Sequence, residues 1–154
     1  MKNQKLLLQK MSGVSLMLLL FLFFSNCAGG GGTFSTDVWN ITYDDQEGGI
    51  SLTYKSKNIC NGMYASYQWE GKEIKTSDYA RHKISTGKVS DSFGKGHIYK
   101  VEYTDKELPE LTQYFYLYPD KEYILTDFTV EAKEEISSAK MAPVNVDSIS
   151  GFLQ

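Results

Sequence analysis

Cys27 is the residue of this sequence whose surroundings most clearly indicate chemistry. It follows a basic and then apolar N-terminal stretch and precedes Ala28 and four consecutive glycines. Bacterial lipoprotein processing attaches a diacylglyceryl group to the thiol of a cysteine in this setting and cleaves the chain immediately before it. Several buried acyl chains hold a protein firmly on a bilayer. The sequence therefore predicts Cys27 as a lipidation site, with the protein anchored to a membrane through lipid.

The stretch before Cys27 has the features of an export signal. Residues 1–26 contain three lysines and no acidic residue, and residues 14–24 are almost entirely apolar. A membrane-spanning helix needs roughly 20 apolar residues, so this shorter run predicts a cleaved helical signal peptide. We expect an exported protein of the periplasm or outer membrane, with residues 27–36 as a Gly-rich tether. Asn26 stands where a small residue is usual, so ordinary secretion without lipid is the alternative.

Three tyrosines form a second pattern with chemical meaning. Tyr114, Tyr116 and Tyr118 recur at every second position, so they lie on one face if the segment is a strand. Aromatic rings arranged in this way form a platform on which sugar rings stack, because the rings combine an apolar face with a polar hydroxyl. The alternative is that a second sheet or a neighbouring domain covers them.

Other residues that could do chemistry lack the spacing that it needs. The two histidines, His82 and His97, are not placed as metal ligands. The adjacent carboxylates at residues 44–45 and 134–135 are expected in turns, where solvent surrounds them. Residues 92–96 resemble a phosphate loop but lack its Gly-Lys-Ser or Thr ending. We therefore expect no metal, no cofactor and no catalytic residue in this chain.

The net charge and the cysteine content bear on nucleic-acid binding and on disulfide formation. The whole chain has 16 basic and 19 acidic residues, and removing the three leader lysines leaves 13 against 19, a net charge of −6. An acidic protein is a poor partner for nucleic acid. With Cys27 lipidated, Cys60 has no second cysteine to pair with, so it is expected to be a small, half-buried strand residue.

The elements that would position these residues are strands. Apolar and polar residues alternate over 38–43, 50–55, 63–70, 97–103, 111–118 and 124–130, with turn residues between them. Residues 76–96 are less regular and are expected to form a loop or a bent edge strand. About seven or eight strands with short turns predict an all-β, antiparallel β-sandwich over residues 37–154. No long amphipathic helix is predicted.

Three segments of the second half resemble a known family. Residues 91–97, Asp-Ser-Phe-Gly-Lys-Gly-His, residues 113–119, Gln-Tyr-Phe-Tyr-Leu-Tyr-Pro, and residues 141–144, Met-Ala-Pro-Val, are similar to the N-terminal β-sandwich of α-galactosidase-like enzymes. The form in question is the secreted lipoprotein type of Bacteroidetes, related to glycoside hydrolase family 36 and to plant raffinose synthase and seed-imbibition proteins. The resemblance covers about residues 37–154.

The resemblance implies a supersandwich-like front domain followed by a (β/α)8 barrel. The barrel would carry an aspartate nucleophile and an aspartate acid/base, neither of which maps onto this sequence. The chain is then the non-catalytic N-terminal part of an exported α-galactosidase-like glycoside hydrolase, with the downstream barrel as its partner. In that arrangement residues 78–82 or the segment after Met141 are expected to border the substrate pocket. The alternatives are a stand-alone carbohydrate-binding lipoprotein and a structural surface lipoprotein without ligand.

Overall fold

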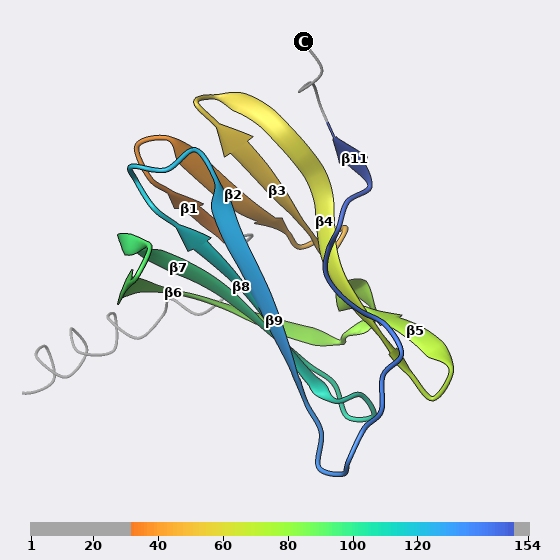
Figure 1. Cartoon of the computed structure of the whole chain (residues 1–154). Coiled ribbons are helices and arrows are strands. Elements are labelled where there is room, and N and C mark those ends of the chain that lie inside the picture. The colour runs from red at the N-terminus through yellow and green to blue at the C-terminus, as the bar shows by residue number, and fades with distance from the viewer. Residues whose placement is uncertain (1–31, 150–154) are drawn as a thin grey trace, which may run out of the picture. The chain divides into compact units, whose positions relative to one another are not determined.

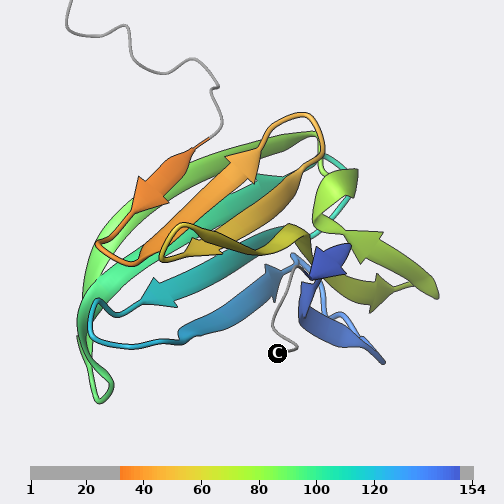
Figure 2. The same cartoon turned by 90° about the horizontal axis from the view of Figure 1, so that it is seen from above.

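The computed structural model describes residues 32–149, and this part of the chain consists of strands and turns with one short 3-10 helix. Two antiparallel sheets pack against each other, so the predicted all-β sandwich is confirmed (Figures 1 and 2). The predicted signal-peptide helix, Cys27 and the segment 150–154 lie outside the described residues. Among residues 32–149, no helix has the length and apolar character that crossing a membrane requires.

The first sheet has seven strands arranged around one long strand, β4. Along its main path β1, β2, β3, β4 and β10 are neighbours, and β5 and β11 also pair with β4. β4 bends near Gly62, whose φ of 64° favours glycine, so that its two halves serve different partners. The strands are β1 (Thr33–Ser35), β2 (Trp39–Asp44), β3 (Gly49–Tyr54), β4 (Lys57–Trp69), β5 (Lys72–Lys75), β10 (Met141–Asn145) and β11 (Ser148–Ile149).

The second sheet is a four-stranded meander in which chain order equals spatial order. It contains β6 (Arg81–Asp91), β7 (Gly94–Thr104), β8 (Glu110–Leu117) and β9 (Ile124–Glu131), and their pairing shows no register shift. In Figure 1 these strands run from green to blue and face the orange and yellow strands of the first sheet. This sheet positions the candidate site.

The irregular region 76–96 contains a short 3-10 helix at Thr76–Asp78, the edge strand β6, the β6–β7 turn and the first residues of β7. The edge-strand interpretation is therefore correct for Arg81–Asp91, and the loop interpretation is not. The alternation was weak because every residue of β6 is exposed or half-buried. Arg81, Lys83 and Lys88 are exposed along this edge.

The N-terminal boundary of the sandwich lies earlier than the sequence predicts. Thr33–Ser35, assigned to the tether, form β1, which pairs antiparallel with β2. The carbonyl oxygen of Gly32 accepts hydrogen bonds from the Tyr43 backbone N–H at 3.1 Å and the Tyr99 hydroxyl at 2.7 Å. A strand of three residues is too short to show an alternating pattern, which is why the sequence did not reveal it.

The core lies between the sheets and is rich in tyrosine. Tyr67 and Tyr99 are completely buried, and Tyr103 is 1% exposed. Burial disfavours the phenolate form, so it raises the pKa of Tyr67, Tyr99 and Tyr103. Their neutral hydroxyls find partners inside the protein, as when the Tyr67 and Tyr79 hydroxyls lie 3.1 Å apart.

Cys60 is a strand residue, as predicted, and is a free cysteine of β4. It is buried and not half-buried as expected, and burial raises the pKa of its thiol. Asp44 and Asp45 are exposed at the β2–β3 turn, where Asp44 Oδ1 accepts the backbone N–H groups of Gln46 and Glu47.

Candidate functional site

Strand β8 sorts its side chains between the core and the outer face of the four-stranded sheet. Leu111, Gln113, Phe115 and Leu117 are buried, whereas Tyr114 and Tyr116 are half-buried on the opposite face. The two tyrosine rings are stacked, with centroids 6.4 Å apart and planes inclined by 20°. We call this pair the tyrosine platform.

Tyr118, the third residue of the predicted ladder, is not part of this platform. It is completely buried, just beyond the end of β8, and its ring lies against Gly96. Its hydroxyl donates a 2.6 Å hydrogen bond to Asp91 Oδ2, and its ring centroid lies 6.2 Å from that of Phe93. Burial and the bond to Asp91 raise the pKa of Tyr118 to about 12, so the hydroxyl stays protonated. Tyr118 therefore closes one end of the platform.

The neighbouring strands supply different surroundings to the two rings. Lys100 and Asp127 pair in register with Tyr114, whereas Ile98 and Leu125 pair with Tyr116. Directly paired residues have Cβ atoms about 4.5–5.5 Å apart, so these side chains flank the rings. The platform thus has an apolar border at Tyr116 and a charged border at Tyr114.

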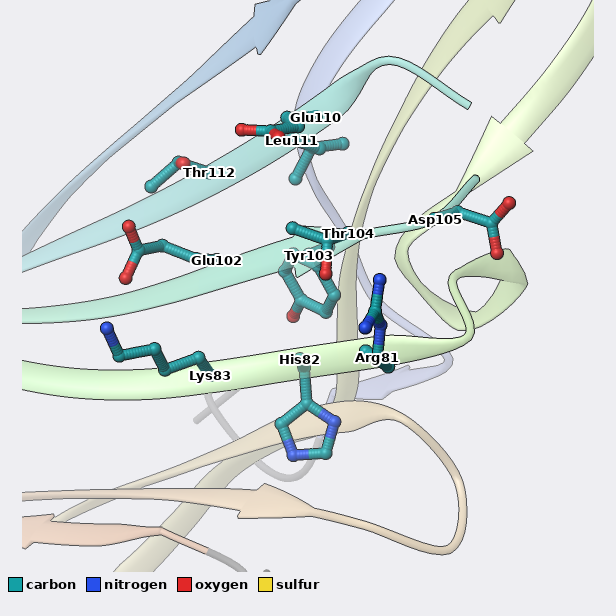
Figure 3. Close-up of a pocket in the computed structure, with 10 residues that line it drawn as sticks. All are labelled: Arg81, His82, Lys83, Glu102, Tyr103, Thr104, Asp105, Glu110, Leu111 and Thr112. Atoms are coloured by element: carbon teal, nitrogen blue, oxygen red, sulfur yellow. The ribbon is translucent and has the colours of Figure 1, made fainter. Parts of the chain in front are cut away.

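A hollow of about 450 Å³ lies at the other end of the same sheet, and we call it the outer hollow (Figure 3). Thr112 connects it to the platform, because Thr112 precedes Tyr114 by two residues and faces the same side of β8. The lining residues come from β6, β7, β8 and the loop after β7: Arg81, His82, Lys83, Glu102, Tyr103, Thr104, Asp105, Glu110, Leu111 and Thr112.

The side chains of β6 divide between the hollow and the other sheet. His82 points to the opposite side of β6 from Arg81 in Figure 3. There its Nε2 lies 2.9 Å from Asp45 Oδ1 in the β2–β3 turn, and its ring centroid lies 4.3 Å from that of Tyr43. His82 therefore links the two sheets, which leaves Arg81 and Lys83 as the cationic groups of β6 at the hollow.

Some charged side chains of the outer hollow already form ion pairs or hydrogen bonds within the protein, and others do not. Glu102 Oε1 lies 3.0 Å from Lys100 Nζ. Asp105 accepts backbone N–H groups of the loop, first that of Glu107 at 2.9 Å, and these bonds lower its pKa. Among the described residues, Arg81, Lys83 and Glu110 form no ion pair. The hollow therefore offers both hydrogen-bond donors and acceptors to a ligand.

The two tryptophans lie elsewhere. Trp39 is 6% exposed, and its Nε1 donates to the Lys121 carbonyl oxygen at 3.2 Å. Trp69 is half-buried and lines a second hollow of about 540 Å³, together with several carboxylates. Trp39 is thus a core residue, and the hollow beside Trp69 shares Asp105 and Glu110 with the outer hollow.

Sequence reasoning identified the tyrosines but not the hollow. That residues 78–82 border the substrate pocket of a downstream barrel stays a prediction; in the described residues, the Arg81 side chain of this segment lies at the outer hollow. Glu102 and Thr112 were not identified, because they meet Lys83 through the pairing of β6 with β7 and of β7 with β8. Lys83 lies in a strand with no buried residue, so the sequence there shows no alternation of apolar and polar residues that would assign its side chain to one face.

The described part of the chain shows no group of three or more His, Cys, Asp or Glu side chains that could hold a metal ion. No protein-family model, no curated protein and no solved structure matches the chain.

Proposed function

We propose that this chain is a carbohydrate-binding sandwich domain, the non-catalytic front part of an exported α-galactosidase-like glycoside hydrolase. The observation that carries the binding role is the tyrosine platform on the outer face of the four-stranded sheet. In this proposal the domain holds α-linked sugar near the enzyme, and catalysis takes place in a downstream barrel of the same polypeptide.

The platform suits a sugar ring for physical reasons. A pyranose has an apolar C–H face and a rim of hydroxyls, so it packs on an aromatic ring while its rim requires hydrogen-bonding groups. Tyr114 and Tyr116 supply two nearly parallel rings, and Lys100 and Asp127 supply a donor and an acceptor beside Tyr114. Both tyrosines are half-buried on the face of β8 opposite to the core, so neither is fully covered within the described residues.

The link to a glycosidase is supported by the sequence resemblance together with the sandwich fold. Two of the similar segments, residues 91–97 and 113–119, contain the β6–β7 turn and most of β8, and so contribute to the platform and its closed end. Sequencing the gene beyond the codon for Gln154 tests this part of the proposal. An open frame with alternating strands and helices supports it, and a stop codon at that point contradicts it.

Replacing either platform tyrosine with alanine is expected to weaken glycan binding. Loss of one stacking ring removes about 0.5–1.5 kcal/mol, so Tyr114→Ala and Tyr116→Ala should each weaken binding by up to about tenfold. The measurement is calorimetric titration of the full chain, purified in detergent, with α-galactosides. Tyr123→Ala is the matched control, because Tyr123 is an exposed tyrosine outside the platform. Equal affinity of all three variants would contradict the proposal.

Lipid attachment to Cys27 is expected to depend on its thiol. Cells expressing the wild-type chain and fed labelled fatty acid should yield labelled protein, whereas Cys27→Ala should yield none. Cys60→Ala serves as the control, because Cys60 is buried in β4 and should not accept lipid. Equal label in wild type and Cys27→Ala would remove the lipid anchor from the proposal.

A further inference from the structure

We infer that the ligand of this face is a neutral oligosaccharide of several sugar rings that lies along β8, from the tyrosine platform into the outer hollow. This inference rests on the proposed carbohydrate-binding function and adds the direction, length and charge of the bound glycan.

The direction follows from the two ends of the platform. Beyond Tyr116, the ring of Tyr118 is completely buried and fixed by Asp91, so it offers no further stacking surface. Before Tyr114, Thr112 leads into the hollow, with Glu110 at its far side. A chain of sugars on the platform can therefore extend toward Thr112.

The length follows from the strand geometry. Tyr116, Tyr114, Thr112 and Glu110 occupy alternate positions on β8, so their side chains face the same side. At about 3.3 Å per residue, the path from Tyr116 to Glu110 is about 20 Å long. The two platform rings span 6.4 Å of this path. A single sugar would leave the hollow empty, whereas an oligosaccharide reaches both parts.

The charge follows from the balance of groups along the path. The cations Arg81, Lys83 and Lys100 stand against the carboxylates of Glu102, Asp105, Glu110 and Asp127. An acidic sugar passing through the hollow would bring its carboxylate close to at least one of these carboxylates, and like charges repel. A neutral hydroxyl both donates and accepts hydrogen bonds, so it can use cations and carboxylates alike.

The test compares α-galacto-oligosaccharides of one to four rings and an oligogalacturonate in calorimetric titrations of the full chain. We expect affinity to rise by about tenfold from the monosaccharide to the tetrasaccharide, and the acidic oligosaccharide to bind more weakly than the neutral one of equal length. In the double variant Arg81→Ala and Glu110→Ala, the gain with length should disappear while monosaccharide binding remains. Both residues are exposed, so the variant should fold, and thermal melting of the apo protein checks this.

Lys88→Gln is the matched control. Lys88 lies on β6 but faces the side opposite to Arg81 and Lys83, because its position differs from theirs by an odd number. The Lys88→Gln variant should therefore show the same increase in affinity from monosaccharide to tetrasaccharide as the wild type. Binding that is independent of length, unaffected by the double variant, or stronger for the acidic glycan would overturn this inference and leave the proposed function intact. Absence of binding for every sugar would overturn both.

Discussion

Replacing Phe115 with alanine is expected to lower the free energy of unfolding by about 3–5 kcal/mol. Phe115 is completely buried at the centre of β8, and its ring meets that of Tyr99 edge-on, with centroids 6.3 Å apart. Truncation removes the apolar ring and leaves a cavity that the surrounding strands fill only in part. A domain of this size has about 5–15 kcal/mol of total stability, so the variant should be close to unfolding. Urea denaturation followed by fluorescence measures the change.

Tyr116→Ala provides the matched control for this prediction. Tyr116 is the next residue of the same strand, but it is half-buried on the outer face. Its removal should cost about 1 kcal/mol or less while it weakens glycan binding. A similar loss of stability for both variants would mean that the outer face is covered in the folded protein, contrary to the assignment of the two faces of β8.

Replacing Gly96 with alanine is expected to destabilise the protein by about 1–3 kcal/mol, because it overpacks a site with no free space. A Cβ atom on Gly96 would lie 2.6 Å from the Leu117 carbonyl oxygen and 2.8 Å from Cδ1 of Tyr118. The first contact is with backbone, which cannot rotate away as a side chain does. The β7–β8 pair would have to separate locally, and the ring of Tyr118 would have to leave its place.

Gly87→Ala is the control, because Gly87 lies in β6 of the same sheet and a Cβ there would meet no atom within 4 Å. Alanine restricts the unfolded chain more than glycine does, so this variant should be unchanged or slightly more stable. Thermal unfolding of both variants distinguishes the two situations. Equal stability of Gly96→Ala and the wild type would show that Tyr118 does not pack on Gly96.

The strands that the sequence predicted well are those with one face buried and one face exposed. In β2, Trp39, Ile41 and Tyr43 are buried while Asn40 and Thr42 are half-buried, and that contrast is the alternating pattern in the sequence. β6 lacks the contrast because it is an edge strand with no buried residue. β1 is too short to show it. Strands were therefore predicted correctly where one face is buried more than the other.

In the candidate site, the sequence could predict features that lie within one strand but not features that depend on contacts between strands. The spacing of Tyr114 and Tyr116 is a property of one strand, so the sequence could reveal the pair. The burial of Tyr118 depends on Gly96 and Asp91, which come from the preceding hairpin. The outer hollow depends on the register of three strands. The burial of Tyr118 and the outer hollow could not be predicted, because each depends on residues that are far apart in the sequence.

The cationic side chains of β6 affect whether two copies of the protein can pair through this edge strand. An edge strand of 11 residues has free backbone groups that can pair with the same strand of another molecule. Arg81, Lys83 and Lys88 place three charged side chains along this edge, and charged side chains on an edge strand disfavour such pairing. This edge is therefore protected against growth of the sheet from one molecule into the next, which matters most for a protein concentrated on a surface.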